Sequence, residues 1–125
     1  MSPNVAFAWC WILVGLLTGA AIGLSFHRTE WLGGYGSWPR RLVRLGHISF
    51  IGTGLLNVAF GWSVQTFDLA SQLSIAPTAF IVGAIAMPIV CFASAWRPQF
   101  RHLFFVPVAS LVIATAETAY WSVLL

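Results

Sequence analysis

Four long runs of apolar residues dominate this sequence and limit what the chain can fold into. Each run has about 20 residues and almost no charge, which is the length an α-helix needs to cross the hydrocarbon core of a bilayer. A soluble domain carries about 25% charged residues, whereas this chain has 7%, with 59% apolar residues. The runs lack the alternation of a strand, so we expect helices, which pair their own backbone polar groups. The predicted helices cover residues 5–26, 45–65, 75–96 and 103–124.

The prediction is therefore an all-α integral membrane protein, a four-helix bundle that forms a single transmembrane domain over residues 1–125. No basic stretch precedes the first apolar run, and that run is long enough to span. We therefore expect it to remain as the first helix and not to be removed as a signal peptide.

The basic side chains, all of them arginines, predict the orientation in the membrane. They follow the first and third predicted helices, while the termini and the connection between the second and third helices have none. The positive-inside rule then places both termini outside, on the periplasmic side of a bacterial inner membrane. The basic charge reflects this topology and contact with anionic lipid headgroups, so nucleic acid is not an expected partner. The arginines are Arg28, Arg40, Arg41, Arg44, Arg97 and Arg101.

Glycines recur at helical spacing in the first two predicted helices. Gly15, Gly19 and Gly23 share one face of the first helix, where small residues let a second backbone approach closely in lipid. The second helix places His47, Phe50, Gly54, Asn57 and Gly61 on one face by spacings of three and four residues. We expect both faces to meet protein, either within the chain or in a neighbouring subunit.

Glu117 lies near the middle of the fourth predicted helix, where a carboxylate costs about 2.5 to 3.5 kcal/mol unless it is paired or protonated. Asn57 of the second helix falls at a similar depth, so a hydrogen bond between the two is expected to be within reach. One hypothesis is a proton relay or the polar end of a quinone site. The other is a protonated carboxyl group that only fixes helix packing.

All three histidines fall near the cytoplasmic side: His27 ends the first helix, His47 begins the second and His102 begins the fourth. Imidazoles on different helices at one depth can hold a haem iron from two sides. Histidines are also ordinary interface residues, and none of these has the close spacing of a metal motif. No metal other than a haem iron is predicted.

The segment "RLGHISFIGTGLLNVAFG", after a glycine-striped first helix, resembles the second helix of subunit I of haem-copper oxidases. The resemblance is greatest to the nitric-oxide-reductase-like branch and the small four-helix proteins related to it, and covers residues 15–61. It implies that His47 is an axial ligand of a b-type haem, with the second ligand from His102, His27 or another subunit. The large family has many more helices and additional copper-binding histidines, so oxygen or nitric oxide reduction is not implied.

Three functional hypotheses follow from these residues. The first is a small subunit of a respiratory or photosynthetic electron-transfer assembly, with haem b at His47 and a quinone near Glu117 and Asn57. The second is a non-catalytic subunit that packs against larger membrane proteins or against copies of itself. The third is a small proton-coupled transporter that uses Glu117. We do not expect the chain to be an enzyme by itself.

Overall fold

The computed structural model describes residues 1–125, and its regular structure is entirely helical. All four long helices are long and apolar enough to cross a membrane, which confirms the predicted all-α class and the number of candidate spans. Two short 3₁₀ helices lie in the connections. The elements are α1 Pro3–Phe26, η1 Trp31–Gly33, α2 Trp38–Thr66, α3 Ala76–Trp96, η2 Pro98–Phe104 and α4 Phe105–Leu124.

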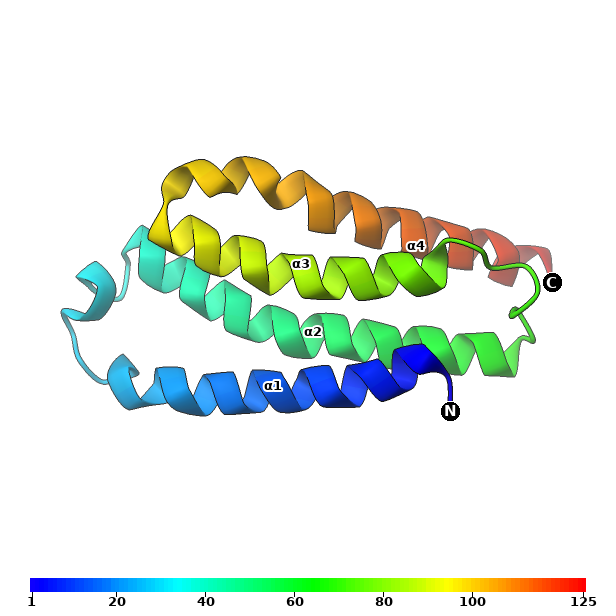
Figure 1. Cartoon of the computed structure of the whole chain (residues 1–125), viewed down its shortest axis with the longest axis horizontal. Coiled ribbons are helices and arrows are strands. Elements are labelled where there is room, and N and C mark those ends of the chain that lie inside the picture. The colour runs from blue at the N-terminus through cyan, green and yellow to red at the C-terminus, as the bar shows by residue number, and fades with distance from the viewer.

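The four helices run up and down and pack in chain order, so that α2 and α3 lie in the middle and α1 and α4 at opposite edges (Figure 1). Both chain termini and the α2–α3 connection lie at one end, which we call the terminal end. The other end holds the loop between α1 and α2, with η1, and the turn into η2. It carries the arginines, and we call it the arginine end.

Serine caps begin the first two helices. Ser2 accepts a hydrogen bond from the backbone N–H of Val5, and Ser37 accepts one from the N–H of Arg40, each with a proline in the first helical turn. The second helix therefore begins at Trp38, seven residues before the predicted start. The apolar run alone placed that start too late, because the first two turns of α2 carry arginines, which lower the hydropathy without weakening a helix.

Glycines bring α1 and α2 into close contact from the terminal end as far as Gly19. A Cβ at Gly15 would lie 2.6 Å from Cβ of Phe50, and a Cβ at Gly54 would lie 2.6 Å from Cγ1 of Ile12. Such distances are shorter than real Cβ contacts, so only glycine allows this approach. These positions support the predicted packing face within the chain, together with Gly19 and Gly61.

Gly23 takes no part in this contact between α1 and α2, and its packing against a neighbouring subunit stays a prediction. A Cβ at Gly23 would have no neighbouring atom within 4 Å. The reason is visible in Figure 1, where α1 and α2 diverge toward the arginine end and the connecting loop folds beside the opening. The close contacts run from Gly61 and Gly54 of α2 as far as Gly19 of α1 and do not reach Gly23.

The terminal end also contains the main cluster of buried apolar side chains. The rings of Phe60 and Phe80 lie 4.8 Å apart between α2 and α3, and the α2–α3 connection covers them. This cluster joins three helices at the terminal end. Its other buried members are Leu69, Leu73, Ala76 and Ala114.

Candidate functional site

Asn57 is fully buried at the centre of a hydrogen-bond network between three helices. Its Oδ1 accepts from the side-chain amide of Asn4 at 2.8 Å, and its Nδ2 donates to the carbonyl oxygens of Thr53 at 3.0 Å and Phe80 at 3.2 Å. The Asn4 amide also donates to the carbonyl of Pro77 at 2.9 Å. Because the buried amide of Asn57 is satisfied by protein groups, the network holds α1, α2 and α3 in register.

Glu117 of α4 lies against the beginning of α3. Oε1 accepts from the backbone N–H of Ser74 at 3.1 Å and from its hydroxyl at 3.2 Å, and Oε2 accepts from the N–H of Ile75 at 3.0 Å and from that of Ala76. The residue at the N-cap of α3 is Ile75, which has no capping side chain. Glu117 therefore performs the capping from a different helix.

Every hydrogen-bond partner of the Glu117 carboxylate is a donor, and donors suit the ionised form of the group. The positive end of the α3 dipole also favours an anion at this place. The expected hydrogen bond between Glu117 and Asn57 is absent, because the carboxylate binds the start of α3 while the Asn57 amide binds Asn4 and carbonyl groups. The two residues form separate polar clusters.

His47 lies half-buried on the face of α2 that meets α1. A Cβ at Gly19 would overlap Nε2 of the imidazole, so this ring nitrogen points directly at the α1 backbone. His47 shares its face of α2 with Gly54 and Gly61, and this face meets protein. What it meets is α1 of the same chain.

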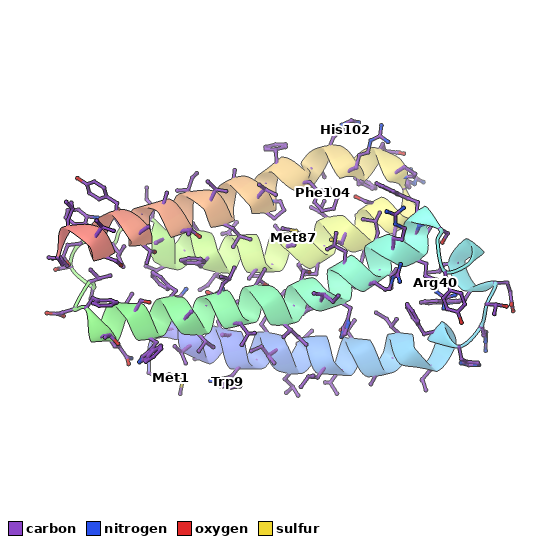
Figure 2. All side chains as sticks on the ribbon, turned by 180° about the vertical axis from the view of Figure 1, so that it is seen from behind. Met1, Trp9, Arg40, Met87, His102 and Phe104 are labelled. Carbon is purple, nitrogen blue, oxygen red and sulfur yellow. The ribbon has the colours of Figure 1, made fainter.

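The three histidines are not gathered into one site. His27 is exposed at the end of α1, two helical turns beyond Gly19, or about 12 Å along the axis. His102 is exposed on η2, at the edge opposite α1, and points away from the other helices (Figure 2). The structure contains no group of three or more histidine, cysteine, aspartate or glutamate side chains placed to hold a metal ion.

These positions test the haem that the resemblance implied. An axial histidine needs iron in line with its coordinating nitrogen and a porphyrin across that line. At Nε2 of His47 that place is taken by the α1 backbone at Gly19, while His27 lies about 12 Å farther along α1 and His102 lies on η2 at the other edge of the row. The residues as arranged do not fit a haem held by Nε2 of His47 and a second histidine of this chain.

Arg40 is a structural residue that the sequence analysis treated only as an orientation signal. Its side chain is fully buried between the diverging ends of α1 and α2 (Figure 2). The guanidinium donates to the carbonyl of Phe26, to that of Arg28 at 2.7 Å and to that of Trp31 at 3.3 Å. It thereby caps the carbonyl end of α1, where the helix dipole favours a cation.

Aromatic rings enclose the same guanidinium. Its central carbon lies 3.9 Å from the ring centre of Tyr35, 4.4 Å from that of Phe26 and 5.4 Å from that of Trp31. Cation–π contacts of this kind are most favourable where water is excluded. A sequence signal for this buried arginine was present, since an aromatic-rich loop precedes an arginine in the first turn of a capped helix. That pattern does not indicate which of the neighbouring arginines is buried.

A cleft of about 480 Å³ opens at the terminal end, between the start of α1, the end of α2 and the start of α3. Phe60, Val64, Leu73 and Ile81 line it with apolar surface, and Asn4 borders it with an amide. Asn4 already donates to Asn57 and Pro77, so the cleft adjoins the amide network. Its size and apolar lining suit the side chains or acyl chains of a neighbour in the membrane.

Comparison with protein-family models, with curated proteins and with solved structures finds no match.

Proposed function

We propose that this chain is a non-catalytic subunit of a membrane assembly, which packs against a transmembrane helix of another protein. The support is that the groups expected to carry chemistry have structural partners inside the fold. Glu117 caps α3, Asn57 joins three helices and His47 packs against Gly19. The electron-transfer assembly that the resemblance implies, with its haem and quinone, stays a prediction.

The observation that carries the proposal is a shallow groove of about 410 Å³ along α4. Its lining side chains are mostly short, and they lie on α4, an edge helix that packs mainly against α3 and leaves its far side uncovered. Association of helices in lipid depends on close van der Waals packing between small residues, since lipid tails are as apolar as the helices. The groove is lined by Leu111, Val112, Thr115, Ala116 and Ala119.

The orientation and location belong to the same proposal. Arginines at one end of the row and none at the other support an orientation with the arginine end in the cytoplasm and both termini in the periplasm of a bacterial inner membrane. A reporter enzyme fused at the C-terminus, active only on one side of the membrane, measures this directly.

The test of the packing proposal is the double substitution Ala116→Leu with Ala119→Leu, which fills the groove. Native gel electrophoresis of mild detergent extracts should show the unmodified chain in a larger assembly and the double variant at the monomer mass. Val106→Phe adds comparable bulk at another exposed position of α4 that does not line the groove, and should leave the assembly intact. Pull-down between two differently tagged copies distinguishes a homo-oligomer from a different partner.

Unchanged co-migration of the double variant would count against the groove as the interface. A dithionite-sensitive Soret band that disappears in His47→Ala would contradict the non-catalytic assignment itself. Gly19→Leu does not serve as a test of the partner, because Gly19 packs against His47 within the chain.

A further inference from the structure

A second cleft, of about 460 Å³, lies at the arginine end between the first two turns of α2 and η2. Trp38, Arg41, Leu42 and Leu45 line it from one face of α2, and Phe104 lines it from the end of η2. The indole N–H of Trp38 donates to the carbonyl of Ser94 at 3.3 Å, which holds this wall against α3. The cleft therefore has one cationic side chain and an otherwise apolar or aromatic lining.

The charge of Arg41 is not balanced by the rest of the chain. Arg40 and Arg44 donate hydrogen bonds to backbone carbonyls, and Arg97 lies over the ring of Trp96, but the Arg41 guanidinium has no such partner. None of the three carboxylates lines the cleft. The one carboxylate at this end, Glu30, bonds to the Thr29 hydroxyl.

Arg101 adds a second cation on the same side. Residues three apart on a 3₁₀ helix project in the same direction, so Arg101 lies on the face of η2 that carries Phe104, one turn nearer the arginine end. Arg101 is exposed, whereas Phe104 is half-buried against the row of helices (Figure 2). Arg41 and Arg101 thus lie nearer the arginine end than the apolar lining at Leu45 and Phe104.

The depth of the cleft suits the boundary between headgroups and hydrocarbon. With 29 residues α2 is about 43 Å long, while the hydrocarbon core measures about 30 Å. Some of α2 must therefore lie among headgroups, and its arginine-rich first turns are the part suited to that layer.

We infer that this cleft binds one anionic phospholipid. Arg41, with Arg101 beyond it, holds the phosphate, and an acyl chain lies along Leu45 and Phe104. Basic pockets at the membrane surface recognise anionic headgroups in this way, and each arginine near the surface contributes about 1 kcal/mol. The acyl chain supplies the contact that a free phosphate would lack.

Native mass spectrometry of the full chain, in detergent with equal amounts of phosphatidylglycerol and phosphatidylcholine, tests the inference. The unmodified protein should retain phosphatidylglycerol in preference. Arg41→Gln should lower that preference about fivefold, which corresponds to about 1 kcal/mol. Leu45→Trp, which fills the cleft without changing the charge, should also reduce retention, whereas added inorganic phosphate should not compete.

The matched control is Arg28→Gln, which removes the same charge from an exposed position at the same end, outside the cleft. It should change the preference by less than about twofold, since a Debye length near 8 Å screens distant exposed charges. Equal losses in Arg28→Gln and Arg41→Gln would mean diffuse attraction and would overturn the site. Equal retention of the two lipids by the unmodified protein would overturn it as well. Unchanged circular dichroism on heating verifies that each variant is folded.

Discussion

At each end of the molecule a helix terminus has unpaired backbone groups, and side chains of opposite charge bind them at the two ends. At the terminal end, α3 begins with unpaired N–H groups, and the carboxylate of Glu117 on α4 binds them. At the arginine end, α1 finishes with unpaired carbonyl groups, and the guanidinium of Arg40 on α2 binds that of Phe26 together with the Arg28 carbonyl of the following loop. Each cap comes from another helix and has the sign that the helix dipole favours.

The two ends differ in how many other contacts hold the helices together besides the capping side chain. Glu117 is half-buried next to a packed apolar cluster and a separate amide network, so several contacts hold that end together. Arg40 is fully buried where α1 and α2 have diverged, and it joins the loop to both helices. We therefore expect the arginine end to rely on one side chain and the terminal end to rely on several.

The largest expected effect is that of Arg40→Met. Loss of the guanidinium leaves buried carbonyl oxygens without donors and removes the centre of the aromatic cage, at a cost of about 3 kcal/mol in the free energy of unfolding. Reversible unfolding in mixed micelles, followed by circular dichroism, measures this loss. Arg41→Met is the matched control and should change stability by less than about 0.5 kcal/mol, because that side chain is exposed.

The next largest effect on stability separates the part of the α1–α2 interface that is closely packed from the part near the arginine end where the two helices diverge. Gly19→Ala places a methyl group against His47 and should destabilise the protein by about 1 to 3 kcal/mol. Gly23→Ala meets nothing within 4 Å and should stabilise it by about 0.5 to 1 kcal/mol, because alanine is the better helix former. If both substitutions had the same sign in the unfolding experiment, the divergence of α1 from α2 would be wrong.

A smaller effect is expected for Glu117→Ala. Removal of a helix cap costs about 1 to 2 kcal/mol, less than Arg40→Met, because the amide network and the apolar cluster remain. Hydrogen exchange should accelerate at the N–H groups of Ser74, Ile75 and Ala76, and Asp68→Asn in the same end of the molecule should leave those rates unchanged. Protected amides in Glu117→Ala would contradict the capping role.

The smallest effect concerns the carboxylate of the arginine end. A hydrogen bond from its own backbone N–H and one from the Thr29 hydroxyl hold the pKa of Glu30 below its ordinary value. A lowered pKa stabilises the fold above the unfolded-state pKa, and this contribution disappears as the pH falls through the folded-state pKa. Thr29→Val should raise the pKa of Glu30 toward its ordinary value, as measured by NMR titration of its carboxyl carbon. An unchanged pKa of Glu30 in Thr29→Val would mean that the Thr29 hydroxyl does not contribute to the lowered pKa.

Several features of the fold could be predicted because they depend on composition and spacing. Apolar length identified the four helices, and the spacing of Gly15, Gly19, Gly54 and Gly61 identified the faces that meet protein. The start of α2 was misplaced because hydropathy measures burial in lipid, while Ser37 and a proline in the first turn begin the helix by hydrogen bonding and backbone geometry.

The candidate site was harder to predict, because depth in the membrane is readable from a sequence but lateral position is not. A hydrogen bond between Asn57 and Glu117 was expected to be within reach because the two residues fall at similar depth. In the row of helices, however, α3 lies between α2, which carries Asn57, and α4, which carries Glu117. The same reason separates His47 from His102, which lie on α2 and on the edge beyond α3.

The sequence by itself determined the class of molecule, four membrane-length helices, because long apolar runs without the alternation of a strand favour helices that pair their own backbone groups. It also determined which helix faces are polar or small. Only the tertiary structure decided which partner each polar side chain takes. The order of the helices in space set Glu117 against the start of α3, Arg40 against the end of α1 and His47 against Gly19. Those partners depend on contacts between residues far apart in the chain, which local spacing does not encode.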